Sequence, residues 1–469
     1  MRPCTHLLTI MKDSMKYHHR LGPFILILIF CCVAQVAAQT AQPKVQPQLP
    51  VIPQRKFLLT DFGANGDGKT LNTDAFRKAI AACRLAGGGE VVVPAGTFVT
   101  GPFALTDNMA LVLAQGATIR ASENFKDYDS TNERDGDAKS RASILPLIGG
   151  WHLTNVAIRG AGTIDGAGAS WWQRFRAERA AGAPQEGQPR AAGQLVEHPR
   201  PKLILLVGCN RVLVQGVTLK DSPQFHLVPN GCHEVTIEDV EINAPANSPN
   251  TDGIDPTGSR NVLIRHCTID VGDDNISFKS NPKEEPLENV LVTGCTFKHG
   301  HGASVGSNIG GGIRNITVEH CTFEETDNGI RIKSARDRGG VVEQITYRDI
   351  TMKNVGTAIT INLFYFDKAG QKERQTKPVT ATTPIVRDVR IVNITIEGAK
   401  LAGEIIGLPE MPVNGVLLEG VRIKAKNGMT IQDAKAVELR AVQITPQQGA
   451  PLTITHAEVK TEQSTAAAH

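Results

Sequence analysis

The sequence lacks a strong excess of either charge and is poor in aromatic residues. The formal net charge of the 469 residues is only +3, which gives no reason to expect nucleic acid or an anionic membrane surface as a partner. Aromatic residues make up 5% of the chain, whereas glycine is abundant at 45 residues. This combination favours a turn-rich β architecture over a helical one. Hydrophobic residues reach 41%, which is enough for a large buried core.

An apolar run long enough to span a membrane is also missing. The stretch from Leu21 to Val36 falls short of the roughly 20 residues that a membrane span needs. It follows a basic start that ends at Arg20, and small residues follow it through Ala38. This order is typical of a secretory signal peptide over residues 1–38. We therefore expect a secreted protein, extracellular or periplasmic, that keeps no membrane contact once the signal is removed.

Cysteines are few, and only six follow the expected signal peptide. Six cysteines in an exported chain of this length permit disulfides but do not make a dense framework. Cys267, Cys295 and Cys321 occupy the same place in the repeat described below, which predicts a stack of small buried core residues. No Cys-x-x-Cys motif or His/Cys pairing indicates a metal site, and we predict none.

A nine-residue pattern recurs along the second half of the chain, with apolar residues at its second, fourth, seventh and ninth places. Copies begin at residues 211, 234, 261, 289, 315, 344, 388, 415 and 436. Two alternating pairs separated by a two-residue step predict two short strands joined by a tight turn. Repeats of this length are typical of solenoids, and the leucine-rich signature is absent while β-branched residues dominate. The sequence therefore predicts an all-β, right-handed parallel β-helix.

The repeat also sets the expected domain boundaries. Residues 39–54, rich in proline and glutamine, predict a flexible leader, residues 55–455 a single β-helix domain, and residues 456–469 a disordered tail. A helix is predicted from Asn72 or Thr73 to the glycines at 87–89, and we expect it to cap the N-terminal end of the stack. The one long gap between copies predicts a loop insertion around residues 367–383 that walls part of a cleft.

A third strand in each rung carries the polar residues of interest. Aligned on successive rungs, the inward pairs are Ile254 and Pro256, Ile276 and Phe278, Ala303 and Val305, and Ile330 and Ile332. Because side chains alternate along a strand, the residues between and after them point outward. The outward set is Asp255, Ser277, Ser304 and Arg331, followed by Thr257, Lys279, Gly306 and Lys333. Asp252, Asp274 and His301 precede the strands at the same turn, with Asp273 beside them, so we expect acids and bases to gather on one face.

Such a cluster has the equipment to split a glycosidic bond. Carboxylates on neighbouring rungs have backbones only about 4.8 Å apart. Like charges this close do not all ionise, so one acid keeps its proton while others stay charged. A proton donor beside proton acceptors fits glycoside hydrolysis, and the Lys and Arg groups fit an anionic sugar. Each motif alone is more typical of a turn cap or a solvated face, and only their convergence favours catalysis.

Four motifs carry a resemblance to a known family. Asn250-Thr251-Asp252, Gly272-Asp273-Asp274, Gly300-His301-Gly302 and Arg331-Ile332-Lys333, in this order, resemble the four signatures of glycoside hydrolase family 28, the polygalacturonases. The similarity extends from about Phe57 to Tyr365. It implies cofactor-free, inverting hydrolysis of α-1,4 bonds between galacturonic acid residues of pectin. Inversion rests on this resemblance, because adjacent rungs favour the shorter carboxylate separation of retaining enzymes.

The resemblance also implies a role for each residue. Asp273 is the expected general acid, while Asp252 and Asp274 activate the attacking water and His301 supports the acid. Arg331 and Lys333 are expected to bind the substrate carboxylate. Asn250, Lys279 and Tyr365 are further candidate substrate-binding residues. The segment between residues 122 and 201 and the loop after Tyr365 favour exo action, because both are placed to close one end of the cleft, and we expect a monomer.

Other functions stay open at this stage. A hydrolase of rhamnogalacturonan or xylogalacturonan is one, although rhamnogalacturonan hydrolases generally lack the His and Arg-x-Lys motifs. A calcium-dependent pectate lyase is another, in which Asp252, Asp273 and Asp274 would bind the ion. A non-catalytic carbohydrate-binding solenoid is the third.

Overall fold

The computed structural model describes residues 45–129, 144–182 and 198–462. The predicted signal peptide over residues 1–38 lies outside these ranges. Within them, no helix is both long enough and apolar enough to cross a membrane.

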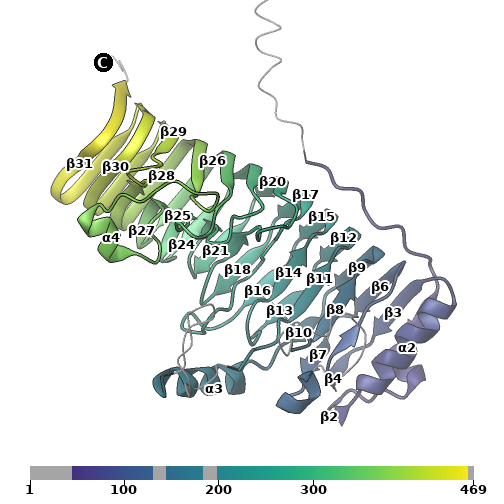
Figure 1. Ribbon diagram of the computed structural model, residues 1–469. Coiled ribbons are helices and arrows are strands. Elements are labelled where there is room, and N and C mark those ends of the chain that lie inside the picture. Colours follow the sequence, from purple (N-terminus) through teal and green to yellow (C-terminus); the bar gives the residue numbers. More distant parts are fainter. Residues whose placement is uncertain (1–44, 130–143, 183–197, 463–469) are drawn as a thin grey trace, which may run out of the picture. The chain divides into compact units, whose positions relative to one another are not determined.

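Parallel strands stack rung upon rung on three sides of a coil (Figure 1). The first side consists of β1 (Lys56–Leu58), β3 (Gly89–Val93), β6 (Met109–Leu113), β9 (Thr154–Gly160), β12 (Asn210–Gln215), β15 (His233–Glu238), β17 (Arg260–Arg265), β20 (Leu287–Thr293), β23 (Ile313–Glu319) and β29 (Val413–Glu419). The second side consists of β2 (Asp67–Leu71), β4 (Gly96–Thr100), β7 (Ala117–Ala121), β10 (Thr163–Asp165), β13 (Thr218–Lys220), β16 (Glu241–Asn243), β18 (Thr268–Val271), β21 (Thr296–His299) and β24 (Thr322–Glu324).

The third side carries the polar motifs. It consists of β5 (Phe103–Ala104), β8 (Ile148–Trp151), β11 (Ile204–Val207), β14 (Leu227–Asn230), bridges at residues 254 and 257, β19 (Ile276–Phe278), β22 (Ala303–Val305), β25 (Asn328–Lys333) and β27 (Thr357–Asn362). Longer strands bend around the coil and contribute to more than one side. These are β26 (Val341–Lys353), β28 (Ile385–Ile406), β30 (Arg422–Arg440) and β31 (Gln443–Glu462). The predicted parallel β-helix is confirmed.

The nine-residue repeat predicts the register correctly. Its second-place residues Val212, Val235, Val262 and Val290 pair in an unbroken row, and all four are buried. A one-residue slip would turn each apolar side chain to solvent, so the alternation itself determines the pairing. Each fully buried aliphatic side chain contributes about 1.5–3 kcal/mol.

The two-residue step inside each repeat is a tight turn with positive φ. Its sixth place holds, among others, Gly216 at φ 72°, Asp239 at 55°, His266 at 53° and Gly294 at 65°. Glycine reaches this left-handed region without penalty, and Asn, Asp and His are the other residues enriched there. The residue types that the repeat places at this step are therefore explained by backbone geometry.

The helices that the structure describes lie outside the nine-residue copies, either before the first copy or in the long gap between two copies. α2 (Thr73–Leu85) occupies the predicted position, and its Phe76 stacks on Phe103 with ring centroids 4.5 Å apart. Its role as a cap stays a prediction. α3 (Ala169–Ala180) belongs to the segment between residues 122 and 201, and α4 (Lys368–Glu373) to the predicted insertion. The described residues also form two short 3₁₀ helices, η1 (Leu59–Phe62) and η2 (Phe125–Tyr128).

The predicted tail begins too early. β31 continues to Glu462 in register with β30, because Ala457 and Val459 keep the apolar alternation and pack against the core. The prediction of disorder is therefore wrong for residues 456–462. Of the predicted leader, residues 45–54 form no strand, and the backbone amides of Gln48 and Val51 donate to Glu234 and Asn155.

All six cysteines that the structure describes are free and buried. Cys267, Cys295 and Cys321 sit on successive rungs of one row, as predicted from the repeat. Their side chains belong to the hydrophobic core and form no disulfide within the described ranges.

Candidate active site

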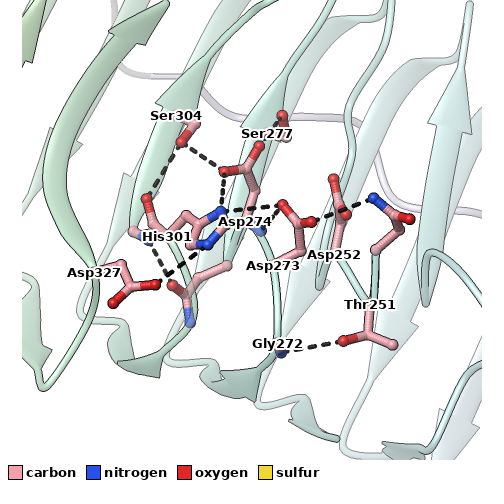
Figure 2. Close-up of polar contacts among 12 residues, drawn as sticks. Thr251, Asp252, Gly272, Asp273, Asp274, Ser277, His301, Ser304 and Asp327 are labelled. Atoms are coloured by element: carbon pink, nitrogen blue, oxygen red, sulfur yellow. Dashed lines mark hydrogen bonds and ion pairs between the residues drawn. The ribbon is translucent and has the colours of Figure 1, made fainter. Parts of the chain in front are cut away.

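Four successive rungs of the third side bring the polar motifs together. Ser277 of β19 pairs with Ser304 of β22, which pairs with Arg331 of β25. The inward neighbours in these strands are buried apolar residues, so the paired residues face outward in one row. Figure 2 shows the acids and His301 meeting on this face. The predicted register of the third strand is confirmed.

Close-packed turns at the start of these strands set the backbone of the motif residues. Gly302 has φ +71°, and a Cβ there would lie 2.2 Å from the carbonyl oxygen of Asn328. The buried amide of Asn275 accepts from the Gly302 N–H at 2.8 Å and donates to the carbonyls of Ile269 and Lys298. Glycine at this position lets the rungs approach closely enough for His301 to reach the acids.

Asp274 is the most strongly held acid of the cluster. Its Oδ1 accepts from Ser304 at 2.8 Å and from Arg331 at 2.9 Å, and its Oδ2 accepts from Ser277 and Lys333, both at 2.9 Å. Burial raises the pKa of Asp274, but the charges of Lys333 and Arg331 outweigh burial and lower it far below its usual range. Asp274 is therefore a carboxylate at any physiological pH.

Asp273 is the most accessible of the three motif acids, with 22% of its side chain exposed against 5% for Asp252 and 2% for Asp274. Its Oδ1 accepts from the Asp274 N–H at 2.9 Å and lies 3.2 Å from His301 Nδ1 (Figure 2). Burial raises the pKa of Asp273, yet its contact with His301 and the nearby charge of Lys333 bring the net pKa below the ordinary value. A general acid needs a raised pKa to keep its proton. Without substrate, the pKa of Asp273 is therefore shifted in the opposite direction.

Asp252 is bound to a lysine instead. Its Oδ2 lies 3.0 Å from Lys279 Nζ, which also lies 2.5 Å from Asp255 Oδ2. Burial raises the pKa of Asp252 well above its usual range, and repulsion from Asp255 adds to this while Lys279 opposes it. The buried Oδ1 atoms of both acids lack a hydrogen-bond partner among the described residues. Asp252 thus keeps one buried carboxylate oxygen that accepts no hydrogen bond from the described residues.

A neutral histidine, His226, forms a hydrogen bond with the backbone carbonyl of Asp252. His226 is fully buried, and burial lowers its pKa to about 4. Its Nε2 accepts from the Ser222 N–H at 3.3 Å, so its Nδ1 carries the proton and donates to the Asp252 carbonyl at 3.0 Å. The turn that carries Asp252 is thereby anchored to the neighbouring rung.

His301 lies between two carboxylates. Its Nδ1 faces Asp273 at 3.2 Å, and its Nε2 lies 3.4 Å from Asp327 Oδ2 (Figure 2). Asp327 is largely exposed, so its attraction is screened by solvent. The imidazole edge is nevertheless directed at the accessible acid.

The predicted substrate-binding residues fall into two groups. Arg331 and Lys333 are more than nine-tenths buried, and both lie under the half-exposed ring of Tyr365, at 5.9 and 5.3 Å from its centroid. These three residues are brought together as the sequence predicts. Lys279 instead has its ammonium between two carboxylates, which leaves it poorly placed to bind an anionic sugar.

Asn250 is also engaged on both sides. Its Oδ1 accepts from Arg200 at 2.7 Å, and its Nδ2 lies 3.4 Å from Asp273 Oδ2. The prediction of a role in substrate binding stays a prediction, but the contacts of the side chain are with the protein.

Several residues that contact the site are not among its predicted catalytic and binding residues, including Asp255, Asp327, His226 and Arg200. Asp255 and Asp327 carry a detectable signal, because both lie on the polar face of rungs that the repeat locates. His226 and Arg200 carry none, since nothing in the local pattern shows that they turn toward the acids.

A metal site is weakly supported by this geometry. One ligand atom each from Asp273, Asp274 and His301 lie within 4.8 Å of one another. Both oxygens of Asp274, however, already accept from the buried cations Arg331 and Lys333. A divalent ion would be repelled by these cations and would compete with them for the same lone pairs.

Known proteins that are similar to this chain include glycoside hydrolases, in agreement with the carboxylates and cations of the site. Residues 83–443 match the family described as Glycosyl hydrolases family 28. A probable polygalacturonase of Vitis vinifera is 31% identical over 381 residues, covering 78% of this chain and 73% of the relative. An endo-polygalacturonase of Pectobacterium carotovorum subsp. carotovorum is 31% identical over 341 residues, covering 70% of this chain and 81% of the relative.

A solved structure is similar over most of its length. The crystal structure of a hyperthermoactive exopolygalacturonase from Thermotoga maritima matches with a TM-score of 0.74 at 28% identity, covering 87% of this chain and 95% of that one. The relatives thus include both an endo-acting and an exo-acting enzyme.

Proposed function

The chain belongs to glycosyl hydrolase family 28, and from this premise we propose that it cleaves the α-1,4 bonds of polygalacturonate with Asp273 as the general acid. One observation carries the proposal: three motif carboxylates meet on adjacent rungs beside two buried cations, Arg331 and Lys333. Carboxylates supply the proton transfers, and the cations supply a subsite for a sugar carboxylate.

The distribution of charge supports the assignment of Asp273. Asp274 is held as a carboxylate by two cations and has no proton to give. Asp252 is nearly buried, whereas Asp273 is accessible to a bound sugar. Because Lys333 helps to lower the pKa of Asp273, a substrate carboxylate bound at Lys333 would offset this charge and raise the pKa. Binding of substrate would thereby help to protonate the acid.

Asp252 and Asp274 are proposed to activate the attacking water. Asp274 is ionised, and Asp252 offers an oxygen that makes no hydrogen bond within the described residues. Lys279 lowers the pKa of Asp252, but burial and the charge of Asp255 outweigh it and the net pKa is raised, so the proposed role as a base requires that Asp252 lose its proton in the complex with substrate. Inversion of the anomeric carbon is proposed from membership of the family. Proton NMR of the first product tests it, because an inverting enzyme releases the anomer opposite to that of the substrate.

Exo action and secretion are also proposals. The insertion that contains α4 follows Tyr365 in the sequence and supports exo action, because it is tied to the coil by Arg374, which donates to Asp433, and by Arg336, which donates to the Gln375 carbonyl. Chromatography of early products on polygalacturonate tests this, since exo action gives monomer alone and endo action a spread of oligomers. We propose secretion from the basic start and apolar run of residues 1–38, and a monomeric state. Fractionation and light scattering test these two points.

The central experiment replaces Asp273 by Asn. We expect Asp273→Asn to bind oligogalacturonate with near-normal affinity and to lose at least about 10²-fold in kcat, because the acid proton is gone. Unchanged turnover would remove Asp273 from this role. A calcium-dependent lyase would give an unsaturated, ultraviolet-absorbing product and would stop with chelator, whereas we expect a saturated product and no effect of chelator.

A further inference from the structure

The side chain of Arg200 joins two segments that are far apart in the sequence. It is 5% exposed, and its Nη1 donates to the carbonyls of Pro223 and Pro249 at 3.1 and 2.6 Å. Its guanidinium lies 4.0 Å from the ring centroid of Phe175, in α3. A buried guanidinium with this many directed contacts is held in a single orientation.

The remaining contact of interest is with Asn250. Arg200 Nη2 donates to Asn250 Oδ1 at 2.7 Å. A guanidinium has donors and no acceptor, so the oxygen of the Asn250 amide must face Arg200 and its NH₂ group must face away. The NH₂ group lies 3.4 Å from Asp273 Oδ2. The guanidinium of Arg200 thus determines which of the two orientations the Asn250 amide adopts.

The backbone at Asn250 explains why an amide residue stands there. Its φ is +53°, in the left-handed region where asparagine is enriched. Asparagine is therefore suited both to this turn and to linking a donor on one side with an acceptor on the other.

We propose that Arg200 is a positioning residue for Asp273, acting through the amide of Asn250. Arg200 holds the amide so that its NH₂ group faces the acid. The inference rests on the proposed role of Asp273. It makes the segment that contains α3 a contributor to the catalytic site, because Phe175 packs on the same guanidinium that orients Asn250.

The consequence for proton transfer follows from the two oxygens of Asp273. Oδ1 already accepts from the Asp274 N–H and faces His301. Oδ2 has only the long contact with Asn250 among the described contacts and is the oxygen with room for the acid proton. An NH₂ group directed at Oδ2 stabilises the carboxylate form and limits where the proton sits. A released amide that turns its oxygen to Asp273 would repel the carboxylate.

The first test is Arg200→Met. We expect kcat on polygalacturonate to fall by about two- to tenfold with KM within about twofold, the scale of one lost hydrogen bond. The basic limb of the pH profile, which reports the acid, should move up by about half a unit. The other charged groups that face Asp273, namely Asp252, Asp274, His301 and Lys333, are unchanged in this variant.

Asn250→Gly is the second variant, and glycine tolerates the positive φ. We expect the same shift of the basic limb as in Arg200→Met and no further shift in the double variant, because both changes remove one link. Additive shifts, or a wild-type basic limb in Asn250→Gly, would overturn the inference. If Arg200→Met does not fold, Asn250→Gly alone decides by the presence or absence of the shift.

Arg176→Met is the matched control. Arg176 also ties α3 to the turn before Asn250, by donating to the Asn247 carbonyl at 2.9 Å, but it does not touch Asn250. We expect an unchanged pH profile. Should Arg176→Met shift the basic limb as Arg200→Met does, the effect would be one of general anchoring and the inference would fail. A failed inference leaves Asp273→Asn inactive, whereas an active Asp273→Asn overturns the proposed function itself.

Discussion

The ammonium of Lys279 lies 3.0 Å from a carboxylate oxygen of Asp252. The same nitrogen contacts Asp255, so one buried cation neutralises part of a pair of buried acids. The side chain is 16% exposed, and Phe225 covers it with the ring centroid 4.3 Å from the nitrogen. Lys279 therefore acts as a counter-ion that holds the Asp252 side chain in place.

Replacing Lys279 by Met should be strongly destabilising. Two buried carboxylates would lose their counter-ion, and the loss of one partner of a buried ion pair typically costs about 3–5 kcal/mol. Urea unfolding measures this. Lys424→Met is the control, because Lys424 is exposed and its ion pair with Glu397 is worth less than about 1 kcal/mol. Equal effects of the two substitutions would contradict the importance of the buried contact.

Asp255 should make stability depend on pH between about 4 and 6. Burial raises its pKa from 3.8 to about 6, with Lys279 opposing the shift. The folded state then binds more protons than the unfolded state in this window, so the contribution of Asp255 to stability is present below pH 3.8 and is lost as pH rises through 6. As pH rises from about 4 to 6, we expect the free energy of unfolding of Asp255→Asn to increase relative to that of the wild type by up to about 3 kcal/mol. A constant difference at all pH values would refute this.

Removal of Lys333 should affect substrate binding and Asp274 together. Its ammonium lies 2.9 Å from Asp274 Oδ2, and it helps to lower the pKa of that acid. In Lys333→Met we expect KM for polygalacturonate to rise by about tenfold, the scale of one charge-assisted hydrogen bond. The acidic limb of the pH profile should move to higher pH. Lys353→Met, on another side of the coil, should leave both unchanged.

Gly302 should not accept a side chain. A Cβ at this position meets two carbonyl oxygens, at 2.2 and 2.3 Å, in addition to the positive φ. Gly63 shares a positive φ of +90° but has nothing within 4 Å of a Cβ. We expect Gly63→Ala to cost about 1–2 kcal/mol and Gly302→Ala to cost more and to abolish activity by displacing His301. Thermal unfolding followed by circular dichroism measures the loss of stability in each variant, and turnover measures activity. A similar loss of stability in Gly63→Ala and Gly302→Ala would contradict the prediction, because it would show that the spacing of the rungs adjusts to the added side chain.

Much of the site could be located from the sequence because a solenoid converts spacing into position. Once the nine-residue copies are aligned, the pairing of Ser277, Ser304 and Arg331 follows from the alternation of their apolar neighbours. The error at residues 456–462 has the same origin, since β31 keeps only a weak apolar alternation that is easily mistaken for a polar tail.

The amino-acid sequence by itself determined the coil, the register of its rungs and which motif residues share a face. These follow from a period-two pattern that tolerates no slip. Only the tertiary structure decided which partner each charged group takes: Asp274 with two cations, Lys279 with two acids, and Arg200 with Asn250. Partner choice depends on burial and on how far each side chain reaches between rungs or, for Arg200, from a segment without a repeat, and no local pattern encodes either.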